Sequence, residues 1–111
     1  MSYDVIIRSA GMGVCDQTLS ETLMKGFIHT LVVKEKLPRH IILYGEGVKL
    51  TCTGSESIED LKVLEEKGVK VLSCGICLDF YELTDDLQVG GVTTMGEVVE
   101  IIAESECIIE P

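Results

Sequence analysis

Short apolar runs rich in Val and Ile alternate along this chain with longer segments in which apolar residues recur every three or four positions. The short runs are typical of buried strands, and the longer segments have the periodicity of amphipathic helices. The predicted strands are residues 3–8, 40–44, 69–73, 88–93 and 106–110, and the predicted helices are residues 18–34, 58–67 and 94–105. This alternation predicts a mostly parallel five-stranded sheet with helices on both faces, which is a three-layer α/β fold.

Two of the predicted helices have a recognisable start. Thr18 with Glu21, and Thr94 with Glu97, have the spacing of a capping box. In the first helix one broad face is predicted to be apolar. It consists of Leu19, Leu23, Phe27 and Leu31, which recur every four residues, with Met24, Ile28 and Val32 beside them. Cys107 lies within the last predicted strand, so we expect it to be a core residue.

Length and charge limit the classes of protein to consider. A chain of 111 residues is expected to form a single domain over residues 1–111. The formal net charge of −10 argues against binding to nucleic acid or to anionic membranes. The sequence has neither an apolar run of the ~18–20 residues that a membrane span needs nor the start of a signal peptide, so we expect a cytoplasmic protein. The five cysteines are then read as thiols.

The residues that carry chemistry are Cys74 and Cys77, in the sequence Cys74-Gly75-Ile76-Cys77. Cys74 follows the third predicted strand, and in a parallel sheet functional groups gather beyond the carboxyl ends of the strands. If a helix begins near Cys77, its free N–H groups favour a thiolate there and lower the thiol pKa. This spacing suits a metal ion, a reversible disulfide or the transfer of a sulfur atom between thiols.

Two of these alternatives lack supporting residues. A structural zinc site needs four ligands, so Cys15 and Cys52 would have to converge on the single CxxC motif. A thioredoxin-like oxidoreductase typically has a proline that faces the motif, but the only proline after Cys77 is the terminal Pro111. The remaining alternative is that Cys74 and Cys77 are buried structural cysteines without a chemical role.

The segments around the motif resemble a known family. The residues that carry the resemblance are 23–27, 47–52, 54–56, 60–62, 64–69, 72–81, 89–90 and 93–95. They are similar to the DsrE-like domain, and most closely to the carboxyl-terminal domain of YedF-type sulfurtransferase-like selenium metabolism proteins. The resemblance implies a flavodoxin-like α/β topology. Glu82 is a departure, because the family commonly has glycine at that position.

The resemblance also implies a function, namely a sulfurtransferase-like carrier in sulfur relay or selenium metabolism. Cys74 falls on the position of the sulfur acceptor, where sulfane sulfur is carried as a persulfide, and Cys77 is a relay or resolving thiol. No cofactor and no metal ion is implied. The expected partners are a protein sulfur donor or acceptor, such as a SirA/TusA-like protein, and further copies of the chain in a dimer, trimer or hexamer. The alternative is a non-catalytic oligomeric assembly module whose CxxC motif is a redox or metal accessory.

Overall fold

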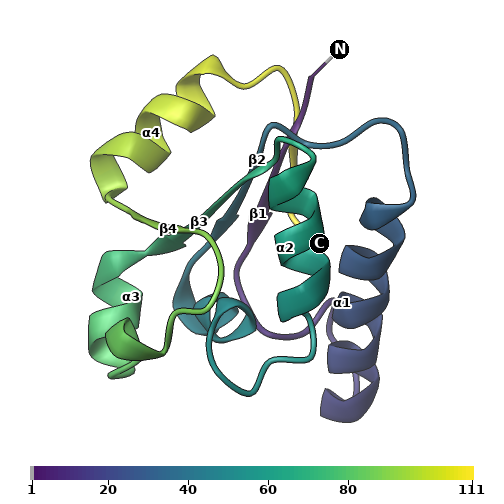
Figure 1. The fold of residues 1–111 in the computed structure, drawn as a ribbon, viewed down its shortest axis with the longest axis vertical. Helices are drawn as coiled ribbons and strands as arrows, with labels where there is room; N and C mark the ends of the chain where they lie inside the picture. Colours follow the sequence, from purple (N-terminus) through teal and green to yellow (C-terminus); the bar gives the residue numbers. More distant parts are fainter. Residues whose placement is uncertain (1) are drawn as a thin grey trace.

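The computed structural model describes residues 2–111, which fold into a five-stranded sheet flanked by helices (Figure 1). In chain order the elements are β1 (Asp4–Ile7), α1 (Gln17–Val32), β2 (His40–Leu43), the 3₁₀ helix η1 (Gly45–Thr51), α2 (Ile58–Glu66), β3 (Lys70–Cys74), α3 (Gly75–Phe80), the 3₁₀ turn η2 (Thr84–Asp86), β4 (Gly91–Thr93), α4 (Met95–Glu104) and β5 (Ile108–Ile109).

All strand pairs in the sheet are parallel, and the strand order is β4-β3-β2-β1-β5. Figure 1 shows α1 and α2 on one side of the sheet and α4 on the other. The three-layer α/β class predicted from the sequence is therefore confirmed. The order is not the 2-1-3-4-5 order of flavodoxin itself, because β3 pairs with β2 and not with β1, and β5 pairs with the other edge of β1.

The two faces of the sheet bury different amounts of apolar surface. The larger core lies between the sheet and the pair α1 and α2, and it includes Val5, Ile7, Met24, Ile28, Ile41, Leu43, Leu61, Leu64, Val71 and Cys74. The smaller core lies under α4 and is built on Ile6, Ile42 and Val98. Alternate residues of β1 thus point to opposite faces, as the period of two along a strand requires.

Helix α1 differs from its prediction at its start, and only part of its predicted broad apolar face is buried. Asp16 caps the helix, since its carboxylate accepts hydrogen bonds from the amides of Thr18 and Leu19, and the predicted Thr18–Glu21 box does not form. Leu19 is 50% exposed, because the stripe that packs on the sheet is the neighbouring one, Ser20, Met24, Ile28 and Leu31. The predicted cap of α4 is confirmed, because Thr94 accepts from the amide of Glu97.

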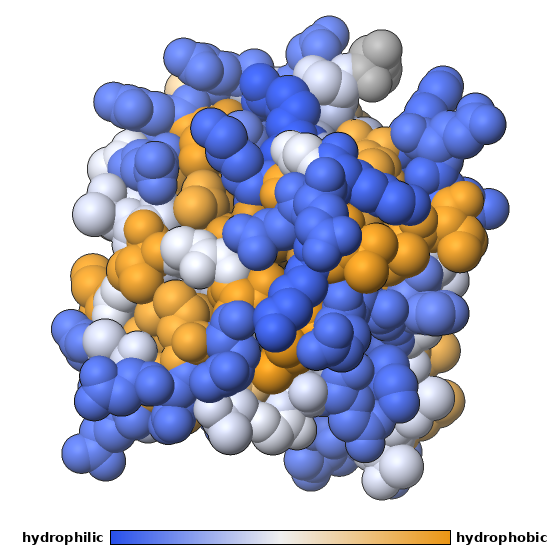
Figure 2. All heavy atoms as spheres, viewed as in Figure 1, coloured by the Kyte–Doolittle hydropathy of each residue, from blue (hydrophilic) through white to orange (hydrophobic). Residues whose placement is uncertain are grey.

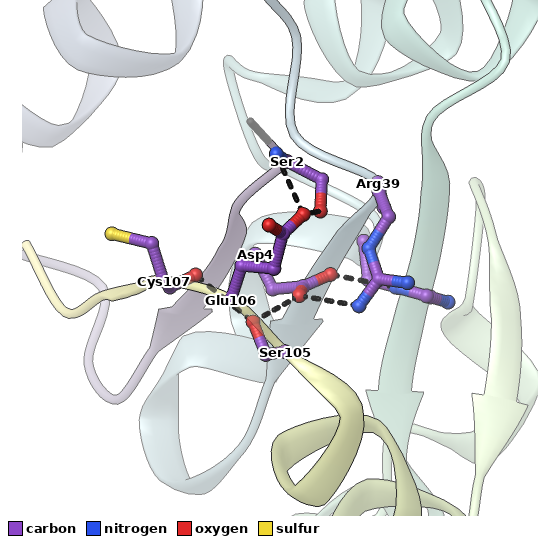
Figure 3. Close-up of polar contacts among 7 residues, drawn as sticks. Ser2, Asp4, Arg39, Ser105, Glu106 and Cys107 are labelled. Atoms are coloured by element: carbon purple, nitrogen blue, oxygen red, sulfur yellow. Dashed lines mark hydrogen bonds and ion pairs between the residues drawn. The ribbon is translucent and has the colours of Figure 1, made fainter.

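The amino-terminal edge of the sheet is held by a buried carboxylate (Figure 3). Asp4 is 1% exposed and accepts hydrogen bonds from Arg39 Nη2 at 2.9 Å, from the hydroxyl of Ser105, and from His40 Nδ1 at 2.7 Å. Cys107 lies at this edge, where its carbonyl accepts from the amide of Asp4. It precedes β5 and is only half-buried, so its prediction as a core strand residue is wrong.

Within residues 2–111, the helices are too short or too polar to cross a membrane.

Candidate functional site

The CxxC motif lies where β3 passes into α3. Cys74 is the last residue of β3 and also the residue that precedes the first turn of α3, so the helix begins at Gly75 and not near Cys77. The turn is tight against β4: a Cβ atom on Gly75 would lie 3.0 Å from the side chain of Val92. The strand end and this close approach fix both thiols at the carboxyl edge of the sheet, as predicted from the sequence.

The two thiols differ in burial. Cys74 is 3% exposed and belongs to the main core, whereas Cys77 is half-buried, one turn along the helix. The Cys74 side chain is near enough to Cys77 to act on the pKa of its thiol. A reagent or partner from solution therefore reaches Cys77 before it reaches Cys74.

A backbone amide from the turn after β2 contacts the site. The N–H of Gly45, just after β2, donates to Cys77 Sγ at 3.1 Å. Gly45 has φ of 58°, a left-handed conformation, and a Cβ atom there would lie 3.0 Å from the carbonyl oxygen of Arg8. Glycine is suited to both requirements. Sequence reasoning missed this donor, although a glycine turn directly after a strand was a signal that could have found it.

The pKa of Cys77 is raised from its ordinary value. Burial is the main cause, the amide of Gly45 acts in the opposite direction, and the adjacent Cys74 thiol raises the pKa further. A lowered pKa from the helix start was expected for this motif, so the expectation is wrong for Cys77. The reason is that α3 has only six residues and a weak dipole, which does not outweigh desolvation of the thiolate.

A buried pair of hydroxyl groups connects the motif to η1. The hydroxyls of Thr51 and Ser73 lie 2.8 Å apart, and both residues are fully buried. Thr51 also donates to the carbonyl of Val48 at 2.8 Å. Because Ser73 directly precedes Cys74, this pair holds the end of β3 against η1, whose first residue is Gly45.

The other three cysteines do not join the pair in a metal site. Cys15 is exposed in the β1–α1 loop, and Cys107 lies at the opposite edge of the sheet. Cys52 is buried after η1, where its thiol donates to the carbonyl of Val48 at 3.2 Å and burial raises its pKa. Throughout the described part of the chain, no group of three or more His, Cys, Asp or Glu side chains is placed to hold a metal ion.

The backbone at the end of α3 shows why glycine would be favoured at position 82, where this chain has Glu82. The amide of Glu82 donates to the carbonyl of Asp79, and the amide of Leu83 donates to the carbonyl of Leu78 at 2.8 Å. This is the Schellman pattern, in which the residue after the cap adopts a left-handed conformation, usually as glycine. Glu82 has φ of 56° and is the only non-glycine residue with positive φ among residues 2–111.

Comparisons with known proteins agree with this architecture. A search of curated proteins gives no match. Among solved structures, the fold resembles a protein of unknown function, MTH1491 from Methanobacterium thermoautotrophicum, with a TM-score of 0.70 and 22% identity over the whole of both chains. It also resembles the ychN protein of E. coli, with a TM-score of 0.72 and 18% identity over the whole of both chains.

A third similar structure, BT1422 from Bacteroides thetaiotaomicron, is a conserved protein of unknown function. It has a TM-score of 0.66 and 14% identity, over 99% of this chain and 95% of its own. At these identities the likeness shows the fold alone. The model of the DsrE/DsrF-like family matches residues 30–111, a segment that includes both cysteines of the motif, and the chain therefore belongs to the DsrE/DsrF-like family.

Proposed function

We propose that this protein is a cytoplasmic sulfur-relay carrier that holds sulfane sulfur as a persulfide on Cys74, with Cys77 as the relay or resolving thiol. The observation that carries the proposal is the pair of neighbouring thiols at the carboxyl edge of the sheet, of which Cys74 is in the core and Cys77 is half-buried. We also propose that, within the DsrE/DsrF-like family, the chain is most similar to YedF-type proteins and has a role in selenium metabolism.

The difference in burial suggests the order of transfer. The thiolate of Cys77 attacks the outer sulfur of a donor persulfide, the S–S bond of the donor breaks, and the donor leaves as a thiolate that takes up a proton. The thiolate of Cys74 then attacks the outer sulfur on Cys77, so the persulfide moves inward and Cys77 returns to its thiolate. Each step exchanges one S–S bond for another without net oxidation. The amide of Gly45 stabilises the Cys77 thiolate at both steps.

Two outcomes are open to a persulfide on Cys74. An acceptor protein can take the outer sulfur by the reverse of the loading steps. Alternatively, Cys77 attacks the inner sulfur of Cys74, hydrosulfide leaves, and a Cys74–Cys77 disulfide remains. The second route oxidises the pair, so a dithiol reductant must reset it.

An exposed apolar surface beside the motif favours a protein partner. It comprises Ile76, Phe80, Val92, Met95 and Val99, which are between 53% and 79% exposed. Figure 2 shows apolar side chains on the side of the molecule where α3, β4 and α4 lie. Ile76 stands between the two cysteines, so a partner that covers this surface meets Cys77. In the proposal that partner is a protein sulfur donor or acceptor, such as a SirA/TusA-like protein, or a further copy of this chain.

Intact-mass spectrometry after incubation with a low-molecular-weight persulfide tests the proposal. The wild type is expected to gain one sulfur atom, and peptide mapping is expected to place it on Cys74. The Cys77→Ser variant should load more slowly, and the Cys74→Ser variant should hold sulfur only on Cys77. Cys15→Ser, which removes an exposed thiol from a neighbouring loop, is the matched control and should load normally. Undiminished loading in a variant that lacks both Cys74 and Cys77 would refute the proposal.

The same apolar surface supports a second candidate, a non-catalytic assembly module with an accessory CxxC motif. This candidate predicts that a partner or a second copy still binds when both motif cysteines are serine. It also predicts that Phe80→Ser abolishes binding while sulfur loading persists. Size-exclusion chromatography with light scattering separates the two candidates, because the relay alone does not require a change in assembly.

A further inference from the structure

Helix α4 has apolar side chains on two of its faces. Val98 and Ile101 pack against the sheet, as expected for a helix that covers one layer. A second set lies outside that contact and is between 41% and 57% exposed: Met95, Val99 and Ile102. Side chains at spacings of four and three residues share one helix face. This second face of α4 is therefore apolar and open to solvent.

Helix α3 and strand β4 continue this apolar surface toward the CxxC motif (Figure 2). Ile76 and Phe80 are one turn apart on α3, and both are exposed. The ring of Phe80 makes a T-shaped contact with Tyr81, with 5.1 Å between the ring centres, so its position is supported from one side. Val92 of β4 joins the two helices, because its side chain lies against Gly75 at the start of α3 and β4 ends two residues before α4 begins.

The negative charge of the chain is concentrated in the segment that forms this surface. Residues 71–111 contain nine Asp and Glu residues and no Lys, Arg or His, whereas residues 1–70 carry only one net negative charge. Four of these carboxylates are exposed on α3, directly after it or on α4: Asp79, Glu82, Glu97 and Glu100. Among residues 2–111, none of the four forms an ion pair. The apolar surface is therefore bordered by carboxylates whose charge is not neutralised within the described chain.

We propose that this surface of α3, β4 and α4 binds a protein partner whose apolar centre is bordered by Lys and Arg side chains. Apolar contacts at the centre and opposite charges at the rim are the usual anatomy of a specific interface. A second copy bound through the same surface would instead bring two sets of carboxylates together, and residues 71–111 hold no cation to offset them. Nucleic acid and anionic membranes would be repelled for the same reason.

The position of the surface connects it to the thiol pair. Ile76 stands between Cys74 and Cys77 in the sequence, so a partner that covers Ile76 and Phe80 meets the half-buried Cys77. The inference rests on the proposed relay only for the role that it gives to the partner, because binding itself needs no sulfur transfer. It specifies the chemistry of the partner surface: apolar at its centre and cationic around it.

Fluorescence anisotropy tests the proposal with the full chain in reducing buffer and three labelled synthetic peptides. The first is an amphipathic helix with Leu on one face and Lys on the other, the second has the same composition in scrambled order, and the third has Glu in place of Lys. The amphipathic Lys peptide should bind saturably and about tenfold more tightly than the scrambled peptide, because only the former presents a continuous apolar face. Its binding should weaken in about 0.5 M NaCl, which screens the charges at the rim. The Glu peptide should not bind.

Matched variants place the binding on this surface. Phe80→Ser should weaken binding of the Lys peptide about tenfold, as expected for a large aromatic side chain at the centre of an interface. Val99→Ser should weaken it about threefold, whereas Val33→Ser, which removes another exposed valine at the end of α1, should bind as the wild type does. Glu100→Gln should weaken it about twofold, and Glu65→Gln on α2 is the control for that charge. All five positions are exposed, so the variants are expected to fold.

Three results would overturn the proposal. They are equal binding of the amphipathic and scrambled Lys peptides, equal effects of Val99→Ser and Val33→Ser, and light scattering that shows a wild-type oligomer which Phe80→Ser dissociates, since a second copy would then occupy the surface. Sulfur loading from a low-molecular-weight persulfide separates this proposal from the relay. Binding of the Lys peptide without loading counts against the relay alone, and loading without binding counts against this surface alone.

Discussion

Replacing Asp4 with asparagine tests whether the buried carboxylate holds the amino-terminal edge of the sheet together. Asparagine has nearly the same shape, but it keeps one acceptor oxygen and presents an NH₂ group in place of the other. Asp4 accepts from Arg39 and His40, at the start of β2, and from Ser105, in the segment before β5 (Figure 3). The variant therefore places a donor against a donor and leaves Arg39 without its counter-charge.

Breaking a buried, hydrogen-bonded ion pair at one partner typically lowers the free energy of unfolding by about 3–5 kcal/mol. Arg39 is 38% exposed, so water partly compensates it, and we expect the lower end of that range, about 3 kcal/mol. This is a large share of the roughly 5–15 kcal/mol that stabilises a domain. With a urea slope of about 1–3 kcal/mol per molar, the unfolding midpoint should fall by about 1–3 M.

Urea unfolding followed by circular dichroism measures this change, and Asp85→Asn is the matched control. Asp85 is exposed on η2, so its substitution should change stability by less than about 0.5 kcal/mol. A loss below about 1 kcal/mol for Asp4→Asn would refute the reasoning, because it would mean that the network does not depend on the charge.

The same carboxylate gives a pH dependence. Burial by itself raises the pKa of Asp4, but the hydrogen bonds from Ser105, Arg39 and His40 and the charge of Arg39 outweigh burial and hold the pKa below its ordinary value. A lowered pKa in the folded state stabilises the fold above the ordinary carboxyl pKa of about 4, and this stabilisation is lost as the pH falls through the lower folded value. The wild type should therefore lose more stability in acid than Asp4→Asn does.

Two further predictions concern α3 and its thiol. Glu82→Gly should raise the free energy of unfolding by about 1 kcal/mol, because glycine adopts the left-handed conformation at this position without strain. Glu100→Gly, inside α4, is the control and should lower the free energy of unfolding by a similar amount. Urea midpoints that move in the same direction for both variants would contradict this prediction. Alkylation of Cys77 by iodoacetamide, mapped by peptide mass spectrometry, should have its midpoint above the ordinary thiol pKa of about 8.5 because burial raises that pKa. A midpoint below that value would mean that the Gly45 amide and the helix start outweigh burial.

Most of the strands could be predicted because they are short apolar runs, rich in Val, Ile and Leu, between turn residues. The class of the fold then follows from the order of the elements, since parallel strands need helical connections. The buried face of α1 could be predicted only as part of a broader apolar face, because Leu19 and Leu23 form an apolar stripe beside that of Met24 and Ile28. Both stripes satisfy the helical period, and only the direction from which α1 meets the sheet decides which one is buried.

For the candidate site too, local features could be predicted from the sequence and contacts between distant residues could not. Its position followed from a CxxC motif at the end of a strand, which is a local feature. The Gly45 amide comes from the start of η1, 32 residues away, so its contact with Cys77 depends on the pairing of β2 with β3. The burial of Cys74 and the sign of the pKa shift of Cys77 depend on what packs around them, and no spacing rule contains that information.

Within the proposed relay, the raised pKa of Cys77 has a direct consequence for rate. A thiol must be deprotonated to attack a persulfide, so only a small fraction of Cys77 is reactive at neutral pH. The isolated protein should therefore accept sulfur slowly at pH 7 and faster as the pH rises toward the Cys77 pKa. A partner that brings a cation beside Cys77 would lower the pKa, and the acidic surface of this chain favours a basic partner. Loading by a protein donor should then be less dependent on pH than loading by a small persulfide.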